Sequence, residues 1–174
     1  MNHIANDPAA KALLSDARLG DVTMNGDTLQ VVFERHYRAS VERVWAAITT
    51  PERIAAWFAP AEIDLRAGGS LSLDANGRRM KMRITICDPP SPLVWVWNIG
   101  GHDTLVRFDL APEASGCRLT LTHSGVPRIG AGVRAGWHAH LEALPDALEG
   151  RSTPWEMKVA REAALNSAYP KLPG

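Results

Sequence analysis

The sequence predicts an α+β fold in which a curved antiparallel sheet is wrapped around a long C-terminal helix. Three observations lead to this prediction. Short segments between Thr28 and His123 alternate apolar with polar residues and are separated by turn residues. Two short amphipathic stretches follow the first of these segments, and a longer one follows the last. Neighbouring strands joined by short turns pair antiparallel, so we expect a meander.

The first strand and the two short helices have clear local signals. The strand is expected in "TLQVVFERHYRA", where alternate residues share one apolar face: Leu29, Val31, Phe33 and Tyr37. Ser40 is a suitable N-cap for a helix in "SVERVWAAI". Pro51 is a suitable first residue for a second short helix, "PERIAAWF".

The rest of the sheet is predicted from alternation and turns. The expected strands lie within "AEIDLRAGGSLSLD", "RRMKMRITIC", "LVWVWN", "TLVRFDL" and "CRLTLTH". Gly68-Gly69 divides the first of these stretches, and Asn76-Gly77 is a strong signal for a two-residue hairpin turn. In the second stretch, one face carries Met80, Met82, Ile84 and Ile86. Arg107 is out of phase with its apolar neighbours and is expected to face solvent.

Two helices are expected after the last strand. The long helix has one apolar face, formed by Val133, Trp137, Leu141, Leu144 and Leu148. Pro145 lies inside it and predicts a kink, because proline removes a backbone hydrogen bond. A second helix is expected after Gly150, and it begins with a capping box of Thr153 and Glu156.

These elements suggest three parts: an N-terminal arm (1–27), a domain (28–150) and a C-terminal helical extension (151–174). The N-terminus lacks a basic start followed by an apolar run, which argues against a signal peptide. No apolar run is long enough for a membrane span. Cys87 and Cys117 form no disulfide framework and have no metal-ligand spacing. We therefore expect a cytoplasmic protein with reduced thiols.

Charge and motif spacing argue against several kinds of function. The 19 Lys and Arg balance the 19 Asp and Glu, so we expect no nucleic-acid partner. His138 and His140 are two residues apart on a helix and point roughly 200° apart, so we expect no metal site there. The Gly130, Gly132 and Gly136 pattern lacks a βαβ context, so we expect no nucleotide cofactor, and no other cofactor is indicated.

A small-molecule cavity is the remaining hypothesis. Several tryptophans and histidines are expected on the inner face of the sheet or on the long helix, where apolar walls with a few polar groups favour a pocket. The candidate lining residues are Trp57, Met82, Trp95, Trp97, His102, His123, Trp137 and His140. The tryptophans and Met82 would give the pocket its shape, and the histidines would form hydrogen bonds. Simple core packing of the same residues is the alternative interpretation.

The chain resembles the START-like, or SRPBCC, helix-grip superfamily between roughly Thr28 and Gly150. The resemblance is carried by "ASVERVWAAITTPERIAAWFAP", "IDLRAGGSLSL", "PPSPLVWVW", "RLTLTHSGVP" and "GWHAHLEALPDAL". These stretches are similar to the branch named after the activator of the heat-shock-protein-90 ATPase. The resemblance implies a cavity, because members of the superfamily bind lipids, sterols, polyketides or aromatic compounds, and a few are cyclases or hydrolases.

Three functions follow from the residues and the resemblance together. The leading one is binding of a small hydrophobic or aromatic molecule whose identity the sequence does not specify. The second is a cyclase-like or hydrolase-like enzyme that uses a pocket histidine as general acid–base, so catalysis stays an open question. The third is a co-chaperone-like interaction domain, although no motif supports a chaperone partner. Trp155 and Val159 lie one turn apart on the last helix and are expected to pack on their own domain, with a homodimer through the terminal helices as the alternative.

Overall fold

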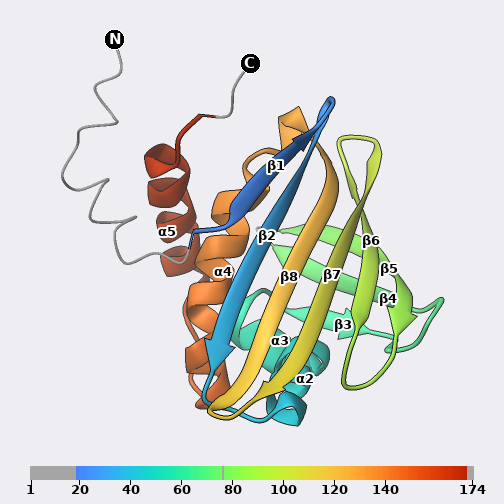
Figure 1. Ribbon diagram of the computed structural model, residues 1–174, viewed down its shortest axis with the longest axis vertical. Coiled ribbons are helices and arrows are strands. Elements are labelled where there is room, and N and C mark those ends of the chain that lie inside the picture. The colour runs from blue at the N-terminus through green and yellow to red at the C-terminus, as the bar shows by residue number, and fades with distance from the viewer. Residues whose placement is uncertain (1–18, 76, 172–174) are drawn as a thin grey trace.

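The computed structural model describes residues 19–75 and 77–171, and its fold confirms the predicted α+β class (Figure 1). Within these residues, eight strands form one curved antiparallel sheet in the order β1-β2-β8-β7-β6-β5-β4-β3. The strands are β1 (Asp21–Asn25), β2 (Thr28–Tyr37), β3 (Ala61–Ile63), β4 (Ser70–Ala75), β5 (Arg78–Cys87), β6 (Leu93–Ile99), β7 (His102–Glu113) and β8 (Gly116–Pro127).

The helices pack together against the sheet. They are α2 (Val41–Thr49), α3 (Pro51–Trp57), the 3-10 turn η2 (Arg128–Gly130), α4 (Val133–Leu148) and α5 (Trp155–Ala168). The long helix α4 contacts α2, α3 and β2, and α5 lies alongside α4 (Figure 1). α4 continues through Pro145 to Leu148. Of the helices in the described part of the chain, none is long and apolar enough to span a membrane.

One of the two predicted helix caps is confirmed. The Ser40 hydroxyl accepts a hydrogen bond from the Arg43 backbone N–H at 3.3 Å, which caps α2 as expected. The capping box predicted for Thr153 and Glu156 is wrong, because α5 begins at Trp155 and has no side-chain cap. The Thr153 backbone N–H instead donates to the Ala56 carbonyl at 3.1 Å. This contact connects the start of α5 to α3.

A register shift in β5 corrects one predicted strand face. Met82 and Ile84 are buried as expected, but Ile86 is 42% exposed. The pairing of β5 with β6 shifts between Ile84 and Ile86. An extra residue in one strand reverses which face the following side chains occupy, so the alternation could not be extended through this point.

The edge strand β1 was not predicted. It pairs with β2 from Asp21 opposite Val32 to Asn25 opposite Thr28. Val22 and Met24 alternate with polar residues and are half-buried, but two apolar side chains are too few to indicate a strand on their own. The remainder of the expected N-terminal arm, 1–18, lies outside the described residues.

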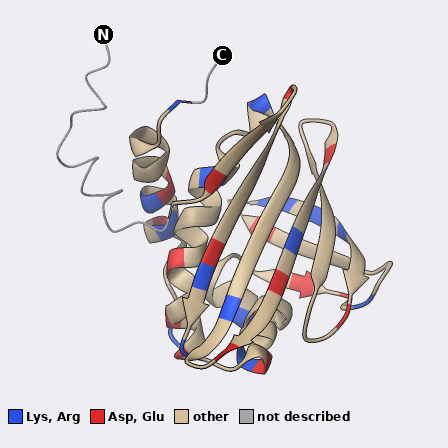
Figure 2. Ribbon diagram, viewed as in Figure 1, with Lys and Arg blue, Asp and Glu red and all other residues tan. Residues whose placement is uncertain are grey.

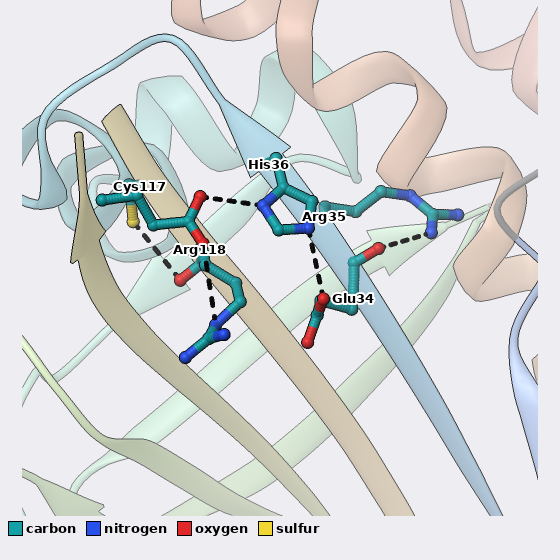
Figure 3. A network of polar contacts seen from close by, with 6 residues as sticks. Glu34, Arg35, His36, Cys117 and Arg118 are labelled. Carbon is teal, nitrogen blue, oxygen red and sulfur yellow. Dashed lines mark hydrogen bonds and ion pairs between the residues drawn. The ribbon is translucent and has the colours of Figure 1, made fainter. Parts of the chain in front are cut away.

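The outer face of the sheet is charged and exposed to solvent. Figure 2 shows acidic and basic residues along β2, β7 and β8. The imidazole of His36 lies between the carboxylates of Glu113, at 2.8 Å, and Glu34, at 3.2 Å. Figure 3 shows the contact between His36 and Glu34 as a dashed line. These contacts, led by the hydrogen bond to Glu113, raise the pKa of His36. Arg107 is part of the same face and pairs with Asp109 at 2.7 Å, as expected for a solvent-facing side chain. The apolar core therefore lies on the other face of the sheet, towards the helices.

Candidate functional site

A cavity of about 200 Å³ lies where α4 and α5 meet the β4–β6 part of the sheet. Its walls come from the segment after α3, three strands and both C-terminal helices. They are formed by Phe58, Ala59, Ala75, Met80, Trp97, Gly132, Val133, Gly136, Trp137, His140, Trp155 and Glu162. An apolar cavity of about 150 Å³ binds benzene in another protein, so this space suits a molecule with one ring.

Aromatic rings form much of the cavity wall and support one another. Trp137 packs edge-to-face against Trp97, with ring centroids 6.2 Å apart and an interplanar angle of 86°. Phe58 lies between Trp137, at 5.3 Å, and His140, at 4.5 Å. Such offset and edge-to-face arrangements are favourable beyond the burial of apolar area. The wall is therefore largely preformed.

A chain of hydrogen bonds holds two of these rings from behind. The Trp137 indole N–H donates to His123 Nδ1 at 3.0 Å, so Nε2 must carry the proton of a neutral imidazole. Nε2 lies 2.8 Å from the Thr104 hydroxyl, which donates in turn to the Trp97 carbonyl at 2.7 Å. The His123 ring also stacks on Trp97 with an interplanar angle of 12°. His123 thus connects strands β7, β8 and β6 to helix α4 immediately behind the cavity.

Burial keeps His123 neutral. The side chain is completely buried, and loss of solvent lowers its pKa to about 3. Both ring nitrogens are engaged in the chain between Trp137 and Thr104. This arrangement positions the aromatic wall and leaves no free nitrogen for a ligand.

His140 presents an acceptor on the cavity wall. Its Nδ1 lies 3.2 Å from the Trp57 carbonyl, which can only accept, so Nδ1 carries the proton. Nε2 therefore has a lone pair. Burial is the main reason that the pKa of His140 falls to about 4, with a smaller contribution from the nearby charge of Lys158. At neutral pH this imidazole remains an uncharged hydrogen-bond acceptor.

Glu162 brings a carboxylate to the same wall. It lies on α5, and its carboxyl carbon is 3.6 Å from the position that a Cβ on Gly136 would occupy. The carboxyl group therefore packs beside Gly136 of α4, at a distance at which a Cβ would make an ordinary contact. Burial raises the pKa of Glu162. Within residues 19–75 and 77–171, its carboxylate forms no hydrogen bond or ion pair.

A polar network fixes α5 against α4 and so sets the position of Glu162. His138 lies 2.5 Å from the Tyr169 hydroxyl and 3.1 Å from the Glu142 carboxylate. Arg161 binds both oxygens of Glu142, at 2.7 and 2.8 Å. Burial would raise the pKa of Glu142, but its hydrogen bonds with Arg161 and His138 together lower it to about 2. The Arg134 guanidinium lies 3.8 Å from the centre of the Tyr169 ring, which also ties the end of α5 to α4.

The structure brings some of the predicted site residues to the cavity and leaves others elsewhere. Trp97, Trp137 and His140 line it, and His123 lies behind its wall. Trp57, Met82 and Trp95 are packed in the core. His102 was expected to face inward, but it is exposed because it begins β7 at a hairpin, beyond the buried part of that strand.

Sequence reasoning missed several wall residues. Phe58 follows α3, and Met80 was placed on the inner face of β5 without being proposed as part of the site. Trp155 was considered only as a residue that packs on its own domain or on a second copy, and not as part of the site. Glu162 had no motif to mark it, because its role depends on how α5 docks. Among the described residues, no three His, Cys, Asp or Glu side chains are grouped so that they could hold a metal ion.

Comparison with known proteins agrees with this architecture. The chain is similar to CalU16 from Micromonospora echinospora, whose crystal structure matches with 30% sequence identity and a TM-score of 0.65, over 84% of this chain and 94% of that chain. A conserved protein of unknown function from Enterococcus faecalis, EF2215, has 18% identity and a TM-score of 0.67 over 93% of this chain and 97% of that one, which supports the fold alone. The search of curated proteins finds no match.

The curved antiparallel sheet and its long C-terminal helix therefore define a START-like domain of the SRPBCC type. A family model described as "Activator of Hsp90 ATPase homolog 1-like protein" matches residues 38–149. The chain belongs to this family. The match excludes β1, β2 and α5. Of these, α5 supplies Trp155 and Glu162 to the cavity wall.

Proposed function

We propose that this protein binds a small ring-containing, mainly apolar molecule in the cavity between the sheet and helices α4 and α5. The observation that carries the proposal is the aromatic wall of Phe58, Trp97, Trp137 and Trp155 around a space of about 200 Å³. Ligand sites are typically concave and apolar, with a few polar groups that orient the ligand. Here His140 and Glu162 supply those groups.

The surroundings of the cavity support binding more than acid–base catalysis. A general base needs a pKa near the working pH and contact with the reacting proton. His123 has a pKa of about 3 and no free ring nitrogen, and His140 has a pKa of about 4. Neither histidine is suited to proton transfer at neutral pH, so the proposed function is binding without catalysis by these residues.

Filling the cavity tests the proposal. Ala75 lines the cavity, so we expect Ala75→Phe to occupy the space and reduce the affinity for ethylbenzene by at least about tenfold, the effect of losing about 1.4 kcal/mol of binding free energy. Isothermal titration calorimetry measures the affinity. Ala114→Phe is the matched control, since it adds the same ring at an exposed turn between β7 and β8. Equal affinities for the two variants, or no saturable binding by the unmodified protein, would contradict the proposal.

A further inference from the structure

The two ionisable side chains on the cavity wall, His140 and Glu162, can both accept a hydrogen bond from a ligand. The Nδ1–H of His140 is directed to the Trp57 carbonyl, which leaves Nε2 as an acceptor. The Glu162 carboxylate accepts hydrogen bonds and carries negative charge. Its pKa is raised by burial, so the cavity provides poor solvation for this charge. A ligand that brings donors and positive charge would relieve that cost.

No basic side chain of the described residues lines the cavity together with Glu162. Lys158 lies one turn earlier on α5, at the spacing at which Lys and Glu side chains can pair. Its ammonium nitrogen is instead 5.8 Å from the centre of the Trp155 ring. Lys158 lines a different hollow, which also contains Glu142 and Arg161.

Aromatic rings complete the surroundings of the carboxylate. Trp97, Trp137 and Trp155 line the same cavity as Glu162. The faces of indole rings attract cations, and this attraction grows when the cation is removed from water. An anionic ligand would meet a carboxylate and electron-rich rings. A cationic ligand would meet the Glu162 carboxylate and the indole rings, and these attractions would have to exceed the repulsion from the Lys158 ammonium, which lies near Trp155 and His140.

We propose that the cavity selects a small molecule in which an aromatic or apolar ring carries a protonated amine, with the amine bound to Glu162 and His140 and the ring packed against the tryptophans. This inference rests on the proposed function and narrows it to a class of ligand. The ring of such a ligand would pack against the apolar and aromatic walls. The ammonium group supplies up to three donors for the carboxylate and the imidazole nitrogen.

Three probes of similar size separate charge from shape. 2-Phenylethylamine carries the ammonium, ethylbenzene carries no charge, and 3-phenylpropionate carries a carboxylate. We expect the unmodified protein to bind the amine about tenfold more tightly than ethylbenzene, the size expected for a hydrogen bond to a charged group at a half-buried site. We expect 3-phenylpropionate to bind more weakly than ethylbenzene. Calorimetric titrations at pH 7 measure all three affinities.

The variant Glu162→Gln keeps the shape of the side chain and removes its charge. We expect it to lose the preference for the amine while retaining its affinity for ethylbenzene. Glu156→Gln is the matched control, because Glu156 is exposed on the same helix and is not part of the cavity wall. Thermal unfolding followed by circular dichroism verifies that both variants are folded.

The outcomes separate this inference from the proposed function. An amine preference that disappears in Glu162→Gln and persists in Glu156→Gln supports the inference. Binding of ethylbenzene without any preference for the amine, or a preference unchanged by Glu162→Gln, overturns the inference and leaves the proposed function standing. Failure of all three probes to bind overturns both.

Discussion

The hydrogen-bond chain that joins Trp137 to Trp97 depends on the protonation state of His123. Nδ1 must be unprotonated to accept the hydrogen bond from the Trp137 indole. A second proton would break that bond and place a charge in a completely buried position. Burial lowers the pKa of His123 to about 3, so at neutral pH the imidazole stays neutral and Nδ1 can accept this hydrogen bond. The histidine thus preserves the aromatic wall as long as the protein keeps it neutral.

This role predicts a stability that falls with acidification. The ordinary pKa of histidine is 6.5, whereas folded His123 and His140 have values of about 3 and about 4. As the pH falls below 6.5, the unfolded chain takes up protons that the folded chain does not. The free energy of unfolding should therefore decrease from pH 6.5 to pH 5, with a slope that approaches about 1.4 kcal/mol per pH unit for each histidine.

Urea unfolding at a series of pH values measures this slope. We expect His123→Gln to reduce the dependence of the free energy of unfolding on pH by the contribution of one histidine, about 1.4 kcal/mol per pH unit at most. This reduction is expected whatever the effect of the substitution on stability at pH 7. His102→Gln serves as the control, since His102 is exposed and outside the buried network. A slope that is unchanged in His123→Gln would show that the buried imidazole is not neutral in the folded protein.

Two glycines in different elements have opposite structural requirements. Gly116, at the start of β8, has a φ of 144°, and a Cβ there would lie 2.0 Å from the Tyr37 carbonyl oxygen. Gly136 lies inside α4, and a Cβ there would meet the Glu162 carboxyl at 3.6 Å, an ordinary contact. Position 116 therefore requires glycine, because any Cβ would clash with the Tyr37 carbonyl and the positive φ would be strained. At position 136, glycine has no such role and only lowers the helix propensity of α4.

Alanine at these positions should therefore change stability in opposite directions. We expect Gly116→Ala to destabilise the protein by at least about 2 kcal/mol, because it combines backbone strain with a clash. We expect Gly136→Ala to stabilise it by up to about 1 kcal/mol, because alanine favours a helix. Chemical denaturation of both variants measures the effects. A loss of stability in Gly136→Ala would mean that the space beside Glu162 is more tightly packed than the contact distance indicates.

Local patterns predicted most elements of the domain, and they failed where tertiary contacts decide the structure. Alternation located β2 and β5 to β8, and helical periodicity located α4. The edge strand β1 alternates, but it has only two apolar residues, which is too short a pattern to predict a strand. α5 begins without a side-chain cap, and Thr153 just before it forms a hydrogen bond to Ala56 of α3 that its sequence does not indicate.

The candidate site was predictable in part for the same reason. Trp97, Trp137 and His140 belong to strongly patterned elements, so their position on inward faces could be inferred. The place of Glu162 depends on the docking of α5, which is fixed by contacts such as that between His138 and Tyr169. A sequence pattern does not specify such a pairing between two helices. The carboxylate therefore emerged only from the folded structure.

On the scale of the whole molecule, the sheet separates two environments. One face carries charged networks around His36 and Arg107, and the other meets the helices and forms the core and the cavity. α5 already buries Leu165 and Tyr169 against its own domain, while Met157 is 63% exposed. A homodimer through the terminal helices stays a prediction, and the cavity is formed within a single chain without it.

The most direct test of the account is to follow the indole N–H signals of the six tryptophans by two-dimensional NMR while 2-phenylethylamine is added. We expect saturable shifts for the cavity residues Trp97, Trp137 and Trp155. We expect little change for Trp45, which does not line the cavity, and for Trp95 in the core. Absence of a saturable shift in the three cavity signals, or equal shifts in all six, would contradict the claim that this aromatic cavity is the ligand-binding site.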